Sequence, residues 1–130
     1  MIEFHLDPSS GVATYVQLVQ QVHQALRVGL LEPGDQLPTA QQVVALLAIN
    51  PNTVLKAYRD LEREGLVRAR PGLGTFVVRL LPGTDPAVLA RFRRSMGAWL
   101  RSAQEAGLSP EEIEAIFRTA TRDRCSEGAA

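Results

Sequence analysis

The chain begins with a short alternating pattern of hydrophobic and polar residues and then changes to a helical period. Residues 2–6 alternate apolar and polar side chains, which predicts a short strand. From Thr14 onward, apolar residues recur at helical spacing, with glutamines largely between them. We therefore expect a first helix that begins near Thr14 and ends between residues 29 and 32, before a turn at residues 33–35.

Two further helices are expected to follow, with a tight connection between them. Thr39 and Gln42 fit a capping box, in which each side chain bonds the backbone N–H of the other residue, so a second helix is expected to begin there. Asn50 and Pro51 are typical of a helix cap and a first helical residue, and this third helix is expected to end at Glu64. A helix-turn-helix requires such a short connection.

The rest of the chain reads as a hairpin, a linker and two more helices. The strand-like runs 66–70 and 75–79 flank a glycine-containing turn, which predicts a β-hairpin. The sequence thus predicts a mainly α fold with a small β-hairpin wing, a winged helix-turn-helix followed by a C-terminal two-helix dimerisation segment. The expected divisions are a DNA-binding domain at 1–80, a linker at 81–85, a helical segment at 86–124 and a tail at 125–130.

Charge changes this picture only when it is examined locally. Lys plus Arg number 14 and Asp plus Glu also 14, so the net charge is zero and predicts no nucleic-acid partner by itself. Residues 51–79, however, are rich in cations, and a helical wheel divides the third helix into an apolar and a polar side. The apolar side has Val54, Tyr58 and Leu61, and the polar side has Asn52, Lys56, Arg59 and Arg63.

Such a division is what a helix that reads the DNA major groove needs, because one side packs while the other offers amides and cations. The alternative is an ordinary solvated helix face. Arg68 and Arg70 share one face of the predicted hairpin beside a glycine tip, where backbone N–H groups can approach a phosphate. A solvent-facing hairpin without a ligand is the alternative there.

The first C-terminal helix carries an apolar stripe at three-four spacing, as along a coiled-coil seam. A helix pair of this size has too few apolar residues for a core of its own. It therefore either folds back on the winged domain or pairs with the same segment of a second chain, and we expect a homodimer. The residues expected to form this contact are Leu89, Phe92, Met96, Trp99 and Leu100.

Residue types that catalysis and metal binding need are scarce or badly spaced. His5 and His23 lie on different predicted elements without ligands at metal-site spacing, and the single cysteine is Cys125. Ser9 and Ser10 lie in a turn rather than a nucleophile elbow. No apolar run reaches the length of a membrane span, and no signal-peptide pattern opens the chain. We expect a cytoplasmic protein that is not an enzyme, with no metal, no cofactor and no membrane partner.

Several ordered motifs resemble those of the GntR family of bacterial transcription regulators. Residues 29–39 resemble the family signature G-x-L-x-P-G-D-x-L-P-S, residues 52–67 its recognition-helix block, and residues 72–77 its wing. The variant at residues 50–54 and the short stretch after the wing are similar to the YtrA-type subfamily.

This resemblance implies an operon repressor that binds an inverted-repeat operator in double-stranded DNA as a homodimer. Members of the subfamily often sit beside ABC-transporter genes; an effector is not implied by the sequence. Carried over position by position, the resemblance implies DNA contacts at Thr39, Gln41, Asn52, Thr53, Lys56, Arg70 and Gly72.

Three departures from the family pattern bear on these contacts. Gln41 stands where the family usually has Arg, Leu55 where it often has a polar or basic residue, and Ala13-Thr14 where it usually has Pro-Ile. Operator sequence or affinity is therefore expected to differ from that of relatives. Two other functions stay open: a small dimeric protein-interaction module, and a sensor with an effector pocket among the C-terminal helices near Trp99.

Overall fold

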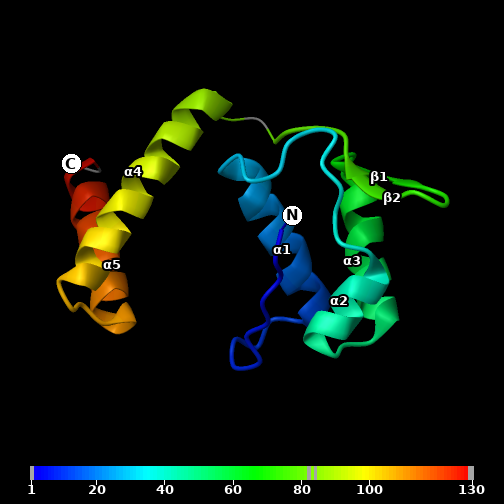
Figure 1. Ribbon diagram of the computed structural model, residues 1–130, viewed down its shortest axis with the longest axis horizontal. Helices are drawn as coiled ribbons and strands as arrows, with labels where there is room; N and C mark the ends of the chain where they lie inside the picture. The colour runs from blue at the N-terminus through cyan, green and yellow to red at the C-terminus, as the bar shows by residue number, and fades with distance from the viewer. Residues whose placement is uncertain (1, 82, 84, 129–130) are drawn as a thin grey trace. The chain divides into compact units, whose positions relative to one another are not determined.

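The computed structural model describes residues 2–81, 83 and 85–128, with side chains to residue 124. The chain divides into two compact units, Met1–Leu89 and Ala90–Ala130. The predicted linker 81–85 includes positions outside the described residues. In chain order the elements are α1 (Thr14–Arg27), α2 (Ala40–Leu47), α3 (Pro51–Arg63), β1 (Val67–Arg70), β2 (Gly74–Val77), α4 (Pro86–Glu105) and α5 (Pro110–Gly128) (Figure 1).

The first unit is a winged helix-turn-helix, as the sequence predicts. α1 and α2 both pack against α3, and β1 follows α3 directly. The capping box of Thr39 and Gln42 is present at the start of α2, and Asn50 caps α3, so the local signals for these two helices are confirmed. The core that they enclose is apolar, and the side chains at its centre are Leu18, Val22, Leu37, Val43, Val54, Leu61, Leu66 and Val77.

A third short segment, residues 34–37, forms an added edge of the wing that the sequence does not predict. β1 and β2 pair antiparallel, with Val67 opposite Val77 and Arg70 opposite Gly74. Residues 34–37 run along β2: the N–H of Gly34 donates to the Val77 carbonyl (2.8 Å), and the N–H of Leu37 donates to the Thr75 carbonyl (2.9 Å). The turn expected at residues 33–35 therefore also holds the wing against the body of the unit.

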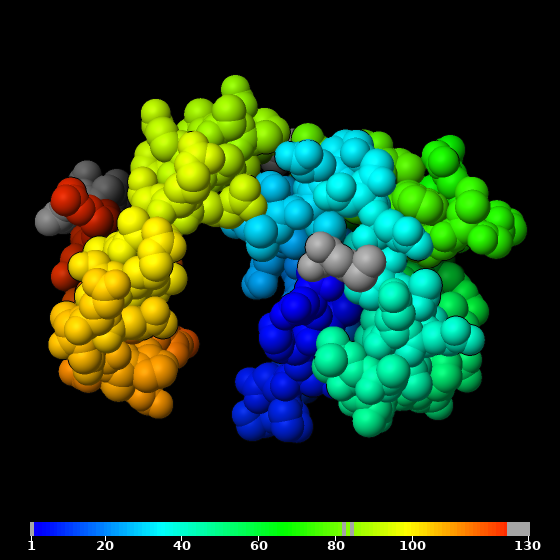
Figure 2. Space-filling view, in the orientation of Figure 1, coloured from blue at the N-terminus to red at the C-terminus, as the bar shows by residue number. Residues whose placement is uncertain are grey.

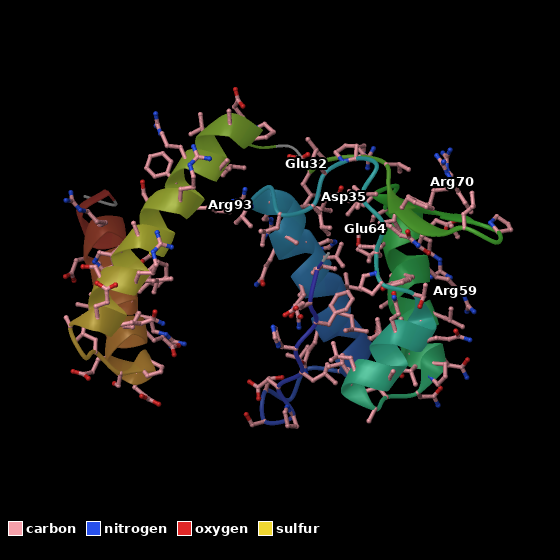
Figure 3. The ribbon with its side chains drawn as sticks, viewed as in Figure 1. Glu32, Asp35, Arg59, Glu64, Arg70 and Arg93 are labelled. Carbon is pink, nitrogen blue, oxygen red and sulfur yellow. The ribbon has the colours of Figure 1, made fainter. Side chains whose placement is uncertain are left out.

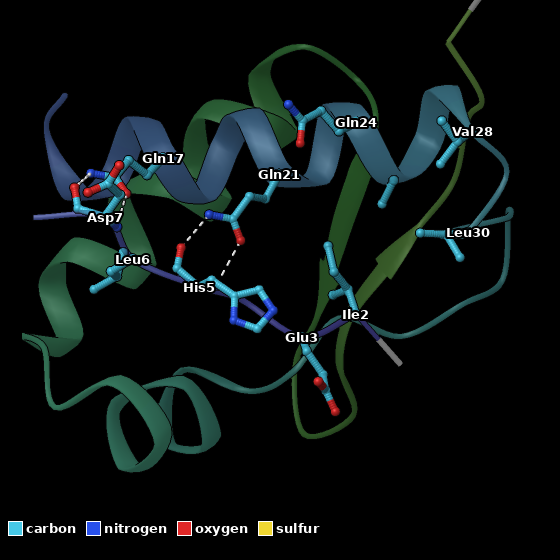
Figure 4. Close-up of a pocket in the computed structure, with 11 residues that line it drawn as sticks. Ile2, Glu3, His5, Leu6, Asp7, Gln17, Gln21, Gln24, Val28 and Leu30 are labelled. Carbon is cyan, nitrogen blue, oxygen red and sulfur yellow. Dashed lines mark hydrogen bonds between the residues drawn. The ribbon is translucent and has the colours of Figure 1, made fainter. Parts of the chain in front are cut away.

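The N-terminal strand predicted at residues 2–6 is wrong. The segment is extended but pairs with no strand; glutamine side chains of α1 satisfy its backbone instead (Figure 4). The N–H of His5 donates to Gln21 Oε1 (2.9 Å), and Gln21 Nε2 donates to the His5 carbonyl. The alternation itself reflects burial, because Phe4 is 2% exposed. An amide side chain carries both N–H donors and an acceptor oxygen, so it can bond the N–H and the carbonyl of one residue as a neighbouring strand would.

The second unit is a pair of helices joined by a tight turn. Gly107 has a φ of +90°, and Ser109 with Glu112 forms a capping box at the start of α5. The hydrogen bonds from Ser109 to the Glu112 carboxylate lower the pKa of that carboxyl below its usual value. α5 continues to Gly128, so the tail predicted at residues 125–130 is wrong as far as Gly128.

Candidate nucleic-acid interface

The exposed face of α3 carries the polar stripe that the helical wheel predicts. Val54 and Leu61 are fully buried and Tyr58 is 7% exposed, so one side of the helix is committed to the core. Asn52, Lys56, Arg59 and Arg63 are all exposed, whereas Thr53 is half-buried beside them. This face presents an amide, a hydroxyl and three cationic side chains, which matches what base edges and phosphates accept.

Tyr58 fixes the start of α2 against the middle of α3. Its buried hydroxyl donates to the Pro38 carbonyl (2.6 Å), and burial raises the pKa of that hydroxyl far above its usual value, so it stays a neutral donor. Thr39 follows Pro38 directly, and its Oγ1 accepts from the N–H of Gln42 (3.1 Å). The Thr39 hydroxyl proton is left to donate to another acceptor, such as a phosphate.

Gln41 lies two residues after Thr39, in the first turn of α2, and is exposed. Its side chain makes no hydrogen bond or ion pair with any other described residue. An amide without a hydrogen-bond partner can both donate and accept hydrogen bonds at a DNA surface, but it supplies no charge. The position is thus accessible and electrically neutral where the family pattern has a cation.

The wing is tied to the same segment. Gln36 Nε2 donates to the Leu73 carbonyl (3.1 Å), next to the exposed Gly72, whose φ is +77°. The Arg70 guanidinium lies 5.4 Å from the centroid of the Phe76 ring, close enough for a cation–π attraction. Residues 36–39 therefore connect the wing tip, the start of α2 and the middle of α3.

The hairpin projects from the surface of the first unit, and Arg59 and Arg70 both extend on the side toward which it projects (Figures 2 and 3). Among the described residues, neither Arg59 nor Arg68 has an acidic partner. The Arg63–Asp60 pair is long, at 3.4 Å, and its Arg side chain is 78% exposed, so it neutralises little. A basic surface thus extends over α3 and the wing.

Arg79 does not belong to that surface, although it contributes to the local charge count. Its Nη2 donates to the Glu64 carbonyl (2.7 Å), at the C-terminal end of α3. The Glu64 carboxylate in turn meets His23 Nε2 of α1 at 2.9 Å. Both contacts stabilise a helix end and the α1–α3 packing rather than offer charge to a ligand.

Lys56 has an aromatic partner that the sequence pattern alone does not indicate. Its Nζ lies 4.0 Å from the centroid of the Tyr15 ring, at the beginning of α1. In the sequence, Tyr15 is simply one position on the apolar stripe of the first helix. The forty residues between the two positions hide the contact, which depends on how α1 packs on α3.

The residues expected to form the dimer contact fall into two sets. Leu89 belongs to the first unit, where it lines a small hollow with Leu26 and Leu80. Phe92, Met96, Trp99 and Leu100 belong to the second unit; the first three are exposed by 59%, 41% and 39%. Between α4 and α5 an open apolar groove of about 540 Å³ is lined by Met96, Trp99, Leu100, Leu108, Ile113 and Phe117.

In the described part of the chain, no three His, Cys, Asp or Glu side chains come together as a metal site. None of the described helices is long and apolar enough to cross a membrane.

Comparison with known proteins gives these features a family. Residues 14–77 match the family of bacterial regulatory proteins named gntR. The chain is 40% identical over 72 residues to the HTH-type transcriptional repressor YtrA of Bacillus subtilis, a match that covers 55% of each protein. It is 31% identical over 112 residues to the HTH-type transcriptional regulator YhcF of the same organism, and that match covers 86% of this chain and 93% of YhcF.

Two solved structures extend the comparison. YtrA from Sulfolobus acidocaldarius, a GntR-family transcription factor, is similar with a TM-score of 0.53 and 26% identity over 92% of this chain and 97% of that one. The DNA-binding domain of AraR in complex with operator ORX1 is similar with a TM-score of 0.51 and 26% identity over 58% of this chain and 93% of that domain. The relatives are transcription regulators. The chain therefore belongs to the GntR family of DNA-binding transcription regulators and is of the YtrA type.

Proposed function

We propose that the chain is a repressor that binds an inverted-repeat operator as a homodimer. In this proposal α3 enters the major groove with Asn52 and Thr53 toward base edges and Lys56 toward the backbone. Thr39 and Gln41 meet phosphates from α2, and Arg70 with Gly72 reaches the DNA from the wing. The exposed basic face over α3 and the hairpin supports this arrangement.

The homodimer rests on the second unit. Among residues 90–124, all of which are described, Ala103 alone is buried. The helix pair nevertheless exposes large apolar side chains, including Phe92 (59%) and Phe117 (51%). A pair of helices with so little buried surface does not form a stable core by itself, and a second copy of the same segment supplies the missing apolar surface. This exposed apolar face is the observation on which the proposal of a homodimer depends.

The repressor role rests on the relationship to the YtrA repressor of Bacillus subtilis. The chain matches about half the length of that protein. Physically, a dimer that occupies an operator excludes other proteins from the same DNA. Two half-sites are also needed to distinguish the operator from other DNA. One recognition helix touches only a few base pairs, and the operator competes with roughly a million other sites.

The proposal can be tested by selecting bound sequences from random DNA and then titrating the selected duplex. We expect an inverted repeat whose half-sites lie about one helical turn apart, or a multiple of that distance. We expect two protomers per duplex in sedimentation equilibrium, and an affinity that falls steeply with added salt through counterion release. A salt-independent interaction with no preferred DNA sequence would instead favour the protein-interaction module.

An effector pocket is the second candidate, and the apolar groove between α4 and α5 favours it. Trp99 lines that groove and is the only tryptophan of the chain, so its fluorescence reports both dimerisation and ligand entry. A fluorescence change that depends on protein concentration supports a dimer contact. A saturable change at fixed oligomeric state on adding small apolar compounds supports an effector site.

A further inference from the structure

The contact between Lys56 and Tyr15 joins the DNA-facing side of α3 to α1. The Lys56 Nζ lies 4.0 Å from the centroid of the Tyr15 ring. Lys56 is exposed and Tyr15 is half-buried, so the ring is held by the core on one side and presents a face to the cation on the other. No acidic group pairs with Lys56 among the described residues.

The ring limits where the Lys56 ammonium can go. A lysine side chain has a flexible four-carbon stem, and an unpartnered one at a surface samples many rotamers. A cation within about 6 Å of an aromatic centroid is attracted by the ring quadrupole, which favours the rotamers that bring Nζ over Tyr15. The charge is thereby kept near α1, at one edge of the stripe formed by Asn52, Arg59 and Arg63.

We propose that Tyr15 is a positioning residue for DNA binding: its ring holds the Lys56 ammonium at the edge of the reading face, where it meets a backbone phosphate. The inference rests on the proposed function, since it requires α3 to face DNA. A phosphate suits this position because the Lys56 ammonium is a compact point charge. The contact with the Tyr15 ring also restricts the lysine side chain before DNA binds, which reduces the side-chain entropy that the DNA contact would otherwise cost.

The cation–π attraction does not neutralise the charge. The ring has no net charge, so a Lys56 held over Tyr15 still attracts an anion, unlike a Lys paired with a carboxylate. The ring also leaves ammonium N–H donors on its far side free, because only one side of the group faces the π surface. Tyr15 can therefore orient Lys56 and leave it competent for phosphate.

The experiment compares four variants by titration of the selected operator duplex at several salt concentrations. Lys56→Ala is expected to weaken binding and to reduce the slope of log affinity against log salt by about one phosphate per protomer. Tyr15→Leu, which keeps apolar volume but removes the ring, is expected to weaken binding about twofold to fivefold per protomer. Tyr15→Phe keeps the ring and is expected to rescue the loss. Tyr15→Leu combined with Lys56→Ala is expected to bind no more weakly than Lys56→Ala alone.

A purely structural role for Tyr15 predicts different results. In that case Tyr15→Leu would lower affinity equally with and without Lys56, and in parallel with a loss of thermal stability. Tyr15→Met provides a second, unbranched replacement if the Leu variant folds poorly. A loss in Tyr15→Phe as large as in Tyr15→Leu would overturn the proposal, because it would assign the effect to the hydroxyl.

A readout without DNA separates this inference from the proposed function. Lys56 is the only lysine of the chain, so protein grown with ¹³C-lysine gives one set of lysine NMR signals. We expect the ε-methylene signal to be shifted upfield by the Tyr15 ring current, and the shift to disappear in Tyr15→Leu. If the wild-type chain binds no DNA, both the function and the positioning role fail. If it binds DNA and Tyr15→Leu binds equally well, only the role of Tyr15 fails.

Discussion

Tyr58 is the residue that couples the two helices of the helix-turn-helix by a hydrogen bond. Its hydroxyl is buried and donates to the Pro38 carbonyl at 2.6 Å. The carbonyl is buried as well, so both groups depend on this one contact. Packing alone would keep α2 near α3, but the hydrogen bond fixes where α2 begins, and with it the position of Thr39.

Tyr58→Phe is expected to lower the free energy of unfolding by about 1–2 kcal/mol at neutral pH, because the Pro38 carbonyl loses its donor. The pKa of the Tyr58 hydroxyl is raised in the folded state, so the folded chain holds this proton more tightly than the unfolded chain. The stabilisation is complete below about pH 10 and is lost as the pH rises toward the folded-state pKa. The advantage of the wild type over the Phe variant should therefore shrink in alkaline urea titrations. Tyr15→Phe is the control, and a difference that stays constant through the alkaline range would contradict this account.

Gln41 is a single-residue departure with a measurable consequence. It is exposed on α2 and uncharged, at the position where the resemblance to the family signature implies Arg. Gln41→Arg is expected to tighten DNA binding and to steepen the dependence of log affinity on log salt by about one phosphate per protomer. The new cation is also expected to relax operator preference if it meets phosphate rather than a base edge.

Gln24→Arg is the matched control for the Gln41 variant, because it adds the same charge on α1 beside the N-terminal segment (Figure 4). It should leave the salt slope nearly unchanged. Anisotropy titrations of both variants against selected and scrambled duplexes give the comparison. Weaker binding by a well-folded Gln41→Arg protein would mean that the amide itself makes a contact that arginine cannot replace.

At the scale of the elements, local signals and long-range pairings differ in how far the sequence predicts them. The caps at Thr39 and Asn50 involve neighbours within three residues, and both are confirmed. The strand at 2–6 is wrong because its partners are side chains of α1, which alternation cannot reveal. The edge formed by residues 34–37 is missed because its partner, β2, lies about forty residues later.

The sequence likewise predicts one part of the candidate interface and not another. The polar stripe of α3 follows from helical periodicity, since it needs only the sequence of one helix. The partners of the cations do not: Arg79 bonds the end of α3, and Lys56 lies over Tyr15 of α1. Both contacts depend on tertiary packing. A charge count over residues 51–79 overstates what is available to DNA because it includes Arg79, which bonds the Glu64 carbonyl.

Substitution of Gly74 tests whether the added edge of the wing, residues 34–37, contributes to the stability of the folded chain. Its φ is +129°, and a Cβ at this position would lie 2.5 Å from Gln36 Nε2. Gly74→Ala therefore forces backbone strain and displaces the amide that donates to the Leu73 carbonyl, and we expect a loss of about 1–3 kcal/mol. Gly72→Ala is the control, because Gly72 also has a positive φ but open space around it. Thermal unfolding should show the larger loss for Gly74→Ala; equal losses would assign the effect to backbone strain alone.

At the scale of the whole molecule, the chain combines a unit with a complete core and a unit without one. Every member of the buried core cluster lies in the first unit, from Phe4 to Val77. In the second unit, Ala103 is the only buried residue among positions 90–124, all of them described. The first unit should thus fold alone, whereas the second needs apolar surface from elsewhere. A homodimer satisfies that need and provides two reading helices for an inverted repeat.

Phe92→Glu is expected to weaken self-association by roughly tenfold or more, because it brings an unpaired carboxylate into a contact that would otherwise be apolar. Ala98→Glu adds the same charge on the opposite side of α4, where the residue is exposed, and should leave self-association nearly unchanged. Sedimentation equilibrium of the full chain measures both. Equal effects of the two substitutions would indicate that net charge, rather than the apolar face, governs association.

Truncation after Pro82 removes α4 and α5 and so tests directly whether these helices hold the homodimer together. The remaining residues keep the whole core cluster, so we expect a folded and largely monomeric domain. It should retain weak, salt-sensitive DNA binding, because the basic face of α3 and the wing is intact. It should lose most of its preference for the selected operator over scrambled DNA, because each protomer then reads only one half-site. Sedimentation and titration of the truncated and full chains against both duplexes measure these differences. If the truncated chain still dimerises and discriminates as well as the full chain, the surface that pairs the protomers lies in the winged unit, and the exposed face of α4 and α5 serves a different partner.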